Sequence, residues 1–153
     1  MIKINVIAVG RLKEKYLKDA CLEYIKRISR YFTLEIIEVP DYADKGSEEQ
    51  LKNLEATLIL QKLKGKVVLL EIEGEQVKSE DIALYIDSEA TKGFSEISFV
   101  IGGCRGVANS VKDKADKTIS FGKITYPHQL IRVILLEQIY RAGTIIKREN
   151  YHK

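Results

Sequence analysis

The chain has 153 residues, 45% of them hydrophobic, which is long enough for one well-packed core and too short for two comfortable domains. No run approaches the roughly 20 apolar residues of a membrane span, and two cysteines are too few for a disulfide framework. We therefore expect a single domain over residues 1–153, no membrane contact, and a reducing, cytoplasmic location.

The net charge of +3 is unevenly distributed along the chain. From Glu35 to Glu96 there are 15 acidic and 7 basic residues, so the two ends together hold 18 basic and 7 acidic residues, a balance of +11. Two interpretations stay open. The ends form a basic face that binds a polyanion, or they form ordinary solvated helix faces.

The first half of the chain alternates between strand and helix patterns. Strands are predicted at 2–9 and 33–39, and an amphipathic helix at 12–31 carries Cys21 on its apolar side as a buried thiol. Ser47 and Gln50 have the spacing of a capping box, which predicts a second helix running to about Leu63.

The second half continues the alternation. Strands are predicted at 66–72, 97–101 and 117–121, with a helix between Ser79 and about Gly93, a short helix through Val111 and a long helix at 129–147. Strands that alternate with helices indicate an α/β domain with a mainly parallel sheet flanked by helices.

The last predicted helix is apolar over most of its surface. Its polar residues form a narrow stripe of Glu137, Arg141, Thr144 and Arg148. A surface helix needs only one apolar face, so the pattern predicts packing on the sheet with one side and on something else with the other. A homodimer explains this simply; a helix buried within one monomer is the alternative.

Three strand ends are the candidate ligand site, because open α/β sheets bind ligands beyond the carboxyl ends of their strands. They are Leu70–Gly74, the "GGCRG" segment Gly102–Gly106, and Phe121–His128. We expect the glycines of the second segment to let the backbone approach a ligand and to supply positive φ angles, although Gly-Gly after a strand is also an ordinary turn.

Several other site classes lack their signatures. There is no G-x-G-x-x-G after the first strand and no G-x-x-x-x-G-K-[ST], which disfavours dinucleotide and P-loop sites. The two histidines and two cysteines show no metal-ligand spacing, so no metal is expected. A nucleophilic Cys104 paired with His128 is a weaker hypothesis than an incidental small residue in a loop.

Four segments carry a family resemblance that covers essentially the whole chain. "INVIAVGRLKEKY", "EYIKR", "IGGCRGV" and "ISFGKITYPHQLIRVILLEQIYRAGTIIKRENYHK" resemble the RlmH family, the YbeA-type SPOUT methyltransferases. The resemblance implies a SPOUT-type α/β knot with a deep C-terminal trefoil knot, a homodimer, and transfer of a methyl group from S-adenosylmethionine to N3 of a pseudouridine in 23S rRNA on the assembled ribosome. The donor contacts that it implies are Leu70, Gly102, Phe121, Gly122, Lys123, Ile124, Thr125 and Tyr126.

The chemistry requires removal of the proton from N3, so a base or a nearby positive charge would help. His128 directly follows the donor-binding run, and Arg132 lies one helical turn further on. His128 could instead only cap the helix. Glu137 and Arg141 have the i, i+4 spacing of an ion pair, which could position Arg141 for RNA or belong to a dimer interface.

The C-terminal segment contributes to the active site in the family, which here means Tyr151, His152 and Lys153. Tyr151 could stack on a base, His152 could act as a base or hydrogen-bond partner, and Lys153 could meet a phosphate. We therefore interpret the tail as a lid over the donor pocket. The rival functions are a nucleotide-dependent oxidoreductase or hydrolase and a non-catalytic ribosome-binding or dimerisation module that keeps the fold.

Overall fold

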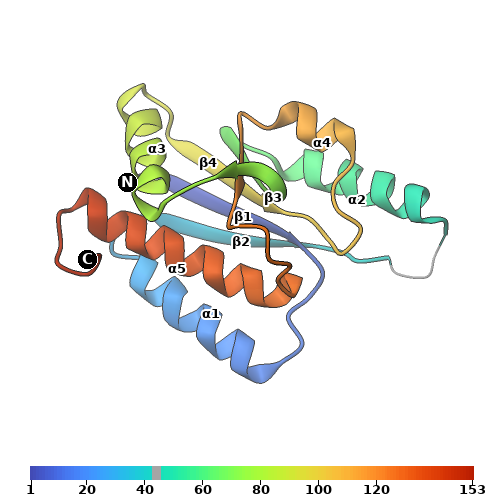
Figure 1. Ribbon diagram of the computed structural model, residues 1–153, viewed down its shortest axis with the longest axis horizontal. Coiled ribbons are helices and arrows are strands. Elements are labelled where there is room, and N and C mark those ends of the chain that lie inside the picture. Colours follow the sequence, from blue (N-terminus) through green and yellow to red (C-terminus); the bar gives the residue numbers. More distant parts are fainter. Residues whose placement is uncertain (43–45) are drawn as a thin grey trace.

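The computed structural model describes residues 1–42 and 46–153, and Figure 1 shows the arrangement of its elements. The strands are β1 (Lys3–Val9), β2 (Thr33–Val39), β3 (Lys66–Gln76), β4 (Glu96–Ile101) and β5 (Lys117–Ser120), and the helices are α1 (Lys15–Ile28), α2 (Glu48–Lys62), α3 (Ser79–Thr91), α4 (Asn109–Lys114) and α5 (His128–Ile146). Every predicted element is present, and the predicted ends agree within three residues except at β3, which extends four residues further.

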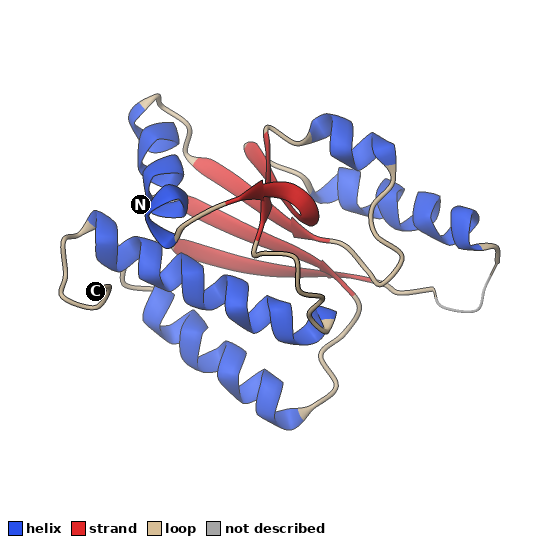
Figure 2. Cartoon of the chain, in the orientation of Figure 1, coloured by secondary structure: helices blue, strands red, loops and turns tan. Residues whose placement is uncertain are grey.

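The five described strands form one sheet in the order β2-β1-β4-β3-β5, and every pairing between them is parallel. Helices α1, α3 and α5 cover one face of this sheet, and α2 and α4 cover the other (Figures 1 and 2). The predicted α/β class with a mainly parallel sheet is confirmed. The trefoil knot that the resemblance implies stays a prediction.

The core has two halves because successive strand residues point to opposite faces of the sheet. On β1, Ile4 and Val6 pack toward α1, α3 and α5, whereas Ile7 and Val9 pack toward α2 and α4. All four side chains are almost fully buried, as expected for a parallel sheet covered on both faces. Cys21 lies in the first half of the core as a buried free thiol, as predicted.

The predicted start of α2 is confirmed. The Ser47 hydroxyl accepts from the backbone N–H of Gln50, and the Gln50 side chain accepts from the backbone N–H of Ser47. The two bonds satisfy donors that a helix N-terminus leaves without intrahelical partners. At the end of α3, Gly93 adopts a φ of 100°, which favours glycine and ends the helix as expected.

The end of β3 is irregular. Its pairing with β5 shifts register between Leu70 and Glu75, and both residues pair with Ile119. Residues 71–74 are therefore displaced from the ladder at the carboxyl edge of the sheet. Gly74 permits this because a Cβ there would lie 2.8 Å from the backbone of Ile119.

Helix α5 packs on the sheet between α1 and α3 (Figure 1). No residue from Ile131 to Ile146 is classed as exposed, so packing within the monomer accounts for most of its apolar surface. The predicted polar stripe is wrong at Thr144, which is fully buried and donates to the carbonyl of Arg141 at 2.6 Å. The homodimer stays a prediction, and the apolar helix no longer requires it. None of the described helices is long and apolar enough to cross a membrane.

Candidate active site

A cavity of about 550 Å³ lies at the carboxyl edge of the sheet. Its size falls within the roughly 300–1,000 Å³ of small-molecule sites. Its walls come from all three predicted strand ends and the first turn of α5. The lining residues are Leu70, Glu71, Ile72, Glu73, Ile101, Gly102, Gly103, Cys104, Gly106, Val107, Ser120, Phe121, Gly122, Ile124, Thr125, Tyr126, Pro127, His128 and Ile131. The prediction that these strand ends share a pocket is confirmed.

Seven of the eight residues that the resemblance assigns to the donor line this cavity. The exception is Lys123, whose neighbours Gly122 and Ile124 both line it. Gly122 adopts a φ of 109°, and the Ser120 hydroxyl holds this turn by accepting from the Gly122 N–H and donating to its carbonyl, each at 3.1 Å.

The Gly102–Gly106 loop is a tight reversal that forms one wall of the cavity. The Gly106 N–H donates to the Gly103 carbonyl at 3.0 Å. Of the three glycines expected to supply positive φ, only Gly106 does so, with a φ of 78°. At Gly102 and Gly103 the reason for glycine is space, because a Cβ would lie 3.3 Å from Val107 and 3.2 Å from Val9 respectively.

The charges on the cavity wall are acidic. Glu71 and Glu73 line it from the end of β3, and no lysine or arginine belongs to its described lining. Lys112 of α4 pairs with Glu71 at 3.0 Å, which leaves Glu73 as the less compensated carboxylate. Such a cavity suits a cationic ligand better than one that carries phosphates.

His128 lines the cavity and is the first residue of α5. The helix cap is Pro127, and no side-chain hydrogen bond caps α5, so the alternative that His128 caps the helix is wrong. His128 and Cys104 both line this cavity, whereas the tail residues Tyr151 and His152 do not belong to its described lining.

Arg132 lies one turn further along α5 and does not line the cavity. Its side chain is 1% exposed, and its guanidinium donates to the Glu38 carboxylate at 2.7 Å and to the Gly10 carbonyl at 3.1 Å. Glu38 also accepts from the backbone N–H of Leu12 at 3.2 Å. Arg132 therefore joins the first turn of α5 to the ends of β1 and β2.

Glu137 and Arg141 form the predicted ion pair. The guanidinium donates to both carboxylate oxygens, with N–O distances of 2.8 and 3.3 Å. The hydrogen bond to Glu137 raises the pKa of Arg141. Tyr151 joins this pair, because its hydroxyl donates to Glu137 at 3.1 Å, its ring lies beneath the Arg141 guanidinium, and it packs edge-on against Tyr140.

The C-terminal tail is anchored. Arg148 adopts a φ of 57°, which reverses the chain after α5. Glu149 then accepts from the Tyr31 hydroxyl at 2.5 Å, and burial together with this bond raises the pKa of Tyr31 to about 12. Chain ends fray unless they are tied down, and this one is tied to the turn between α1 and β2 as well as to α5.

His152 is held at both ring nitrogens. Nδ1 lies 3.1 Å from the Arg141 guanidinium, and Nε2 contacts the Glu80 carboxylate at the start of α3. Since a guanidinium only donates, Nδ1 accepts, and Nε2 carries the proton that is donated to Glu80. This bond lowers the pKa of Glu80.

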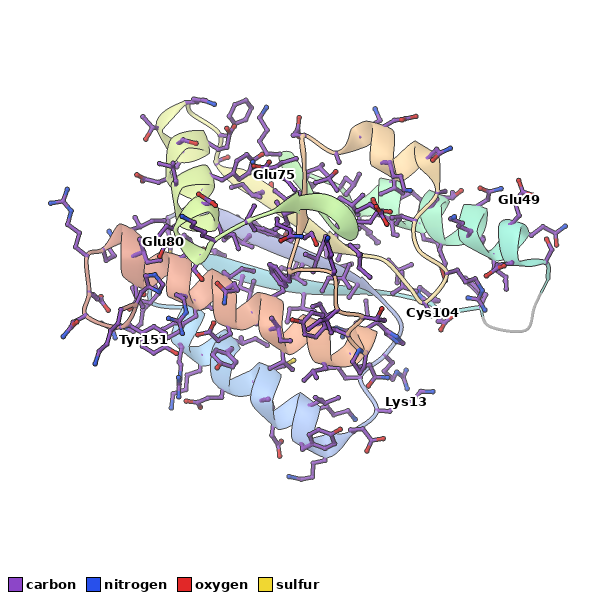
Figure 3. All side chains as sticks on the ribbon, viewed as in Figure 1. Lys13, Glu49, Glu75, Glu80, Cys104 and Tyr151 are labelled. Atoms are coloured by element: carbon purple, nitrogen blue, oxygen red, sulfur yellow. The ribbon has the colours of Figure 1, made fainter. Side chains whose placement is uncertain are left out.

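The tail and the cavity lie at opposite ends of α5. A helix of 19 residues spans about 28 Å, and Figure 3 shows Tyr151 and Cys104 at opposite sides of the molecule. The predicted lid over the donor pocket is therefore not formed within one chain, and it stays a prediction for a tail that reaches the cavity of another chain. His128 and His152 do not meet within one protomer.

Several residues that hold α5, the tail and the Gly102–Gly106 loop in place were not predicted from the sequence. Glu38, Glu80 and Tyr31 pair with α5 and the tail. Glu55 of α2 pairs with Arg105 of the Gly102–Gly106 loop. No local pattern marks them. Among the described residues, no group of three or more His, Cys, Asp or Glu side chains is placed to hold a metal ion.

A family model described as "Predicted SPOUT methyltransferase" matches residues 2–152. The chain belongs to the SPOUT methyltransferase family. It is 48% identical over 159 aligned positions to Ribosomal RNA large subunit methyltransferase H 1 of Clostridium perfringens (strain SM101 / Type A), with 99% of this chain and 100% of the relative covered. It is 45% identical, with the same coverage, to Ribosomal RNA large subunit methyltransferase H of Streptococcus pneumoniae (strain CGSP14). The RlmH resemblance inferred from sequence motifs is confirmed.

Proposed function

We propose that the protein uses S-adenosylmethionine to methylate N3 of a pseudouridine in 23S rRNA on the assembled ribosome. The cavity of about 550 Å³ carries this proposal, because its walls are the strand ends that the resemblance assigns to the donor. The names of the full-length relatives support a large-subunit rRNA substrate. The chain's basic ends are consistent with an RNA partner.

The cavity's residues fit this donor. Phe121 and Tyr126 offer aromatic surface to a purine ring, and backbone groups of the glycine loop lie at the cavity wall. Glu71 and Glu73 suit a molecule that carries a sulfonium and an ammonium, whereas they oppose the pyrophosphate of a dinucleotide. This charge pattern disfavours the oxidoreductase alternative.

When bound, the donor supplies a methyl group already activated on a sulfonium. The chain's residues must then hold the donor in line with N3, exclude water, and hold or remove the N3 proton. His128 at the cavity and His152 in the tail are the two candidates for that proton. Arg132, buried behind the cavity, positions the first turn of α5 and does not touch the reacting atoms.

A site that uses both the cavity and the tail requires two protomers, because α5 separates them by about 28 Å. We therefore propose a homodimer in which the tail of one protomer is presented at the cavity of the other. Tyr151 then stacks on the target base, and Arg141 and Lys153 contact RNA phosphates.

The test is methyl transfer by the purified protein from labelled S-adenosylmethionine to ribosomes of a strain that lacks the modification. We expect one methyl group per 23S rRNA, at N3 of a pseudouridine, identified by mass spectrometry of the digested RNA. Donor binding without incorporation would favour the non-catalytic module. Tight binding of NAD with no binding of S-adenosylmethionine would favour the oxidoreductase.

Single variants distinguish the roles of the two histidines. If His152 holds the N3 proton, His152→Gln abolishes the pH dependence of methyl transfer while His128→Gln retains it, and the reverse result assigns the role to His128. Calorimetric titration with the donor serves as the folding and binding control for both variants.

A further inference from the structure

We propose that Glu55 is a positioning residue for the methyl donor, acting through Arg105 to fix the Gly102–Gly106 loop that forms one wall of the cavity. The inference rests on the proposed function only in taking S-adenosylmethionine as the ligand. It assigns a role to a buried carboxylate that lies outside the cavity.

Glu55 is a carboxylate at a buried position, where a charge lowers the stability of the fold. It lies on α2, is 2% exposed, and neither of its carboxylate oxygens has a hydrogen-bond partner among the described residues. Burial raises its pKa, the negative charge of Asp41 acts in the same direction, and Arg105 opposes them. A buried carboxylate without hydrogen bonds destabilises a fold. Its presence here therefore calls for a reason other than stability.

The carboxylate of Glu55 meets the glycine loop at two points. A guanidinium nitrogen of Arg105 lies 3.6 Å from Oε1 of Glu55 and 3.5 Å from Oδ1 of Asp41. A Cβ placed on Gly103 would lie 3.3 and 3.4 Å from the two Glu55 oxygens, so the carboxylate lies close beside the loop at this glycine. Glu55 thus supports both the backbone and the charged side chain of this loop.

The other side of the same loop faces the ligand. Gly102, Gly103 and Gly106 line the cavity, whereas Glu55 and Arg105 do not. A glycine-rich loop without an anchor samples many conformations, and a ligand that binds only one of them binds more weakly by the fraction populated. The anchor at Glu55 therefore favours donor binding without touching the donor.

The experiment is calorimetric titration of S-adenosylmethionine into wild-type protein and Glu55→Gln, with thermal unfolding of both. The neutral amide keeps the shape and releases Arg105, so we expect donor affinity to fall about fivefold, an effect typical of residues that act without contact. Thermal stability should stay unchanged or rise, because a buried charge has been removed. A residue that only stabilised the fold would not lower donor affinity on substitution while leaving thermal stability unchanged or higher.

Glu89 provides a matched control. It is also buried on a helix, at 5% exposure, with one oxygen lacking a hydrogen-bond partner among the described residues, but it pairs with Lys92 at 3.0 Å and lies outside the cavity lining. Glu89→Gln should lower thermal stability and leave donor affinity unchanged.

A double-mutant cycle tests the route through Arg105. Arg105→Met should weaken donor binding by a similar factor, and Glu55→Gln/Arg105→Met should be no weaker than the worse single variant. If Glu55→Gln does not fold, Arg105→Met alone carries the test. Wild-type affinity in these variants, or additive effects, would overturn the inference, whereas wild-type protein that binds no donor would overturn the proposed function and this inference together.

Discussion

Removal of the last three residues, Tyr151–Lys153, is expected to separate methyl transfer from folding and donor binding. The deletion removes the contacts of His152 with Arg141 and Glu80. It also removes three contacts of Tyr151, which are its hydrogen bond to Glu137, its edge-on packing against Tyr140 and its contact with Arg141. The hydrogen bond stabilises the fold by about 1 kcal/mol, the aromatic pair by about 0.5–1.5 kcal/mol and the contact with the guanidinium by about 0.5–1 kcal/mol. The three contacts of Tyr151 total about 2–3.5 kcal/mol, which lowers the Tm of a chain of this length by about 4–14 °C.

Donor affinity should change by less than about twofold, because the tail lies about 28 Å from the cavity of its own chain along α5 and none of the donor contacts implied by the resemblance is a tail residue. Methyl transfer to ribosomes should fall by at least about 100-fold, the smaller end of the effect of losing a proton-transfer residue. The dissociation constant comes from calorimetric titration, and the rate from incorporation of labelled methyl groups into 23S rRNA.

Tyr151→Phe is the matched control, since it removes only the hydroxyl that donates to Glu137. It should lower stability by about 1 kcal/mol and keep most of the activity if stacking on RNA is what the ring contributes. A truncated protein that methylates ribosomes at the wild-type rate would refute the assignment of the tail to the active site. A truncated protein that is folded but has lost donor binding would refute the assignment of the tail to RNA alone, and would show that the tail contributes to the donor site.

Three further predictions concern residues around the site. Arg132→Met leaves the partly exposed Glu38 carboxylate without its buried partner, so stability should fall by about 2 kcal/mol in urea unfolding; an unchanged midpoint would argue against the anchoring role. Gly106→Ala places a side chain at a φ of 78°, and we expect the free energy of unfolding to fall by about 1–2 kcal/mol and calorimetry to show weaker donor binding. Unchanged stability and donor affinity would contradict this prediction. The bond to His152 lowers the pKa of Glu80. The stability that this bond contributes is therefore present above the ordinary glutamate pKa and is lost as pH falls through the lowered value. Carbon NMR titration should show the Glu80 pKa returning to its ordinary value in His152→Ala.

The positions of the strand ends could be predicted from the sequence because they follow from local pattern and one topological rule. Alternating strands and helices imply a parallel sheet, and a parallel sheet brings its carboxyl ends to one edge. The capping residues Ser47 and Gln50 were predictable for the same reason, since all the partners lie within four residues.

The contacts that anchor α5 could not be predicted in this way. Arg132 pairs with Glu38 across 94 positions, and His152 pairs with Glu80 across 72. The i, i+4 pattern cannot show such partners, so Arg132 could be placed on the helix but not in the interior. The same limit explains why the sequence left open which chain's cavity the tail reaches: spacing gives the length of α5 but not what lies at its far end.

The position of α5 links assembly to activity. Its first turn closes the cavity through His128 and its last turn carries the tail, so the helix that completes the proposed donor site also holds the proposed RNA-contacting residues about 28 Å away. We therefore expect a folded protomer to bind the donor without being competent for transfer. If two protomers build the active site, dilution below the dimer dissociation constant should abolish methyl transfer while donor binding persists, and a mixture of tail-deleted and cavity-defective chains should recover activity that neither has alone.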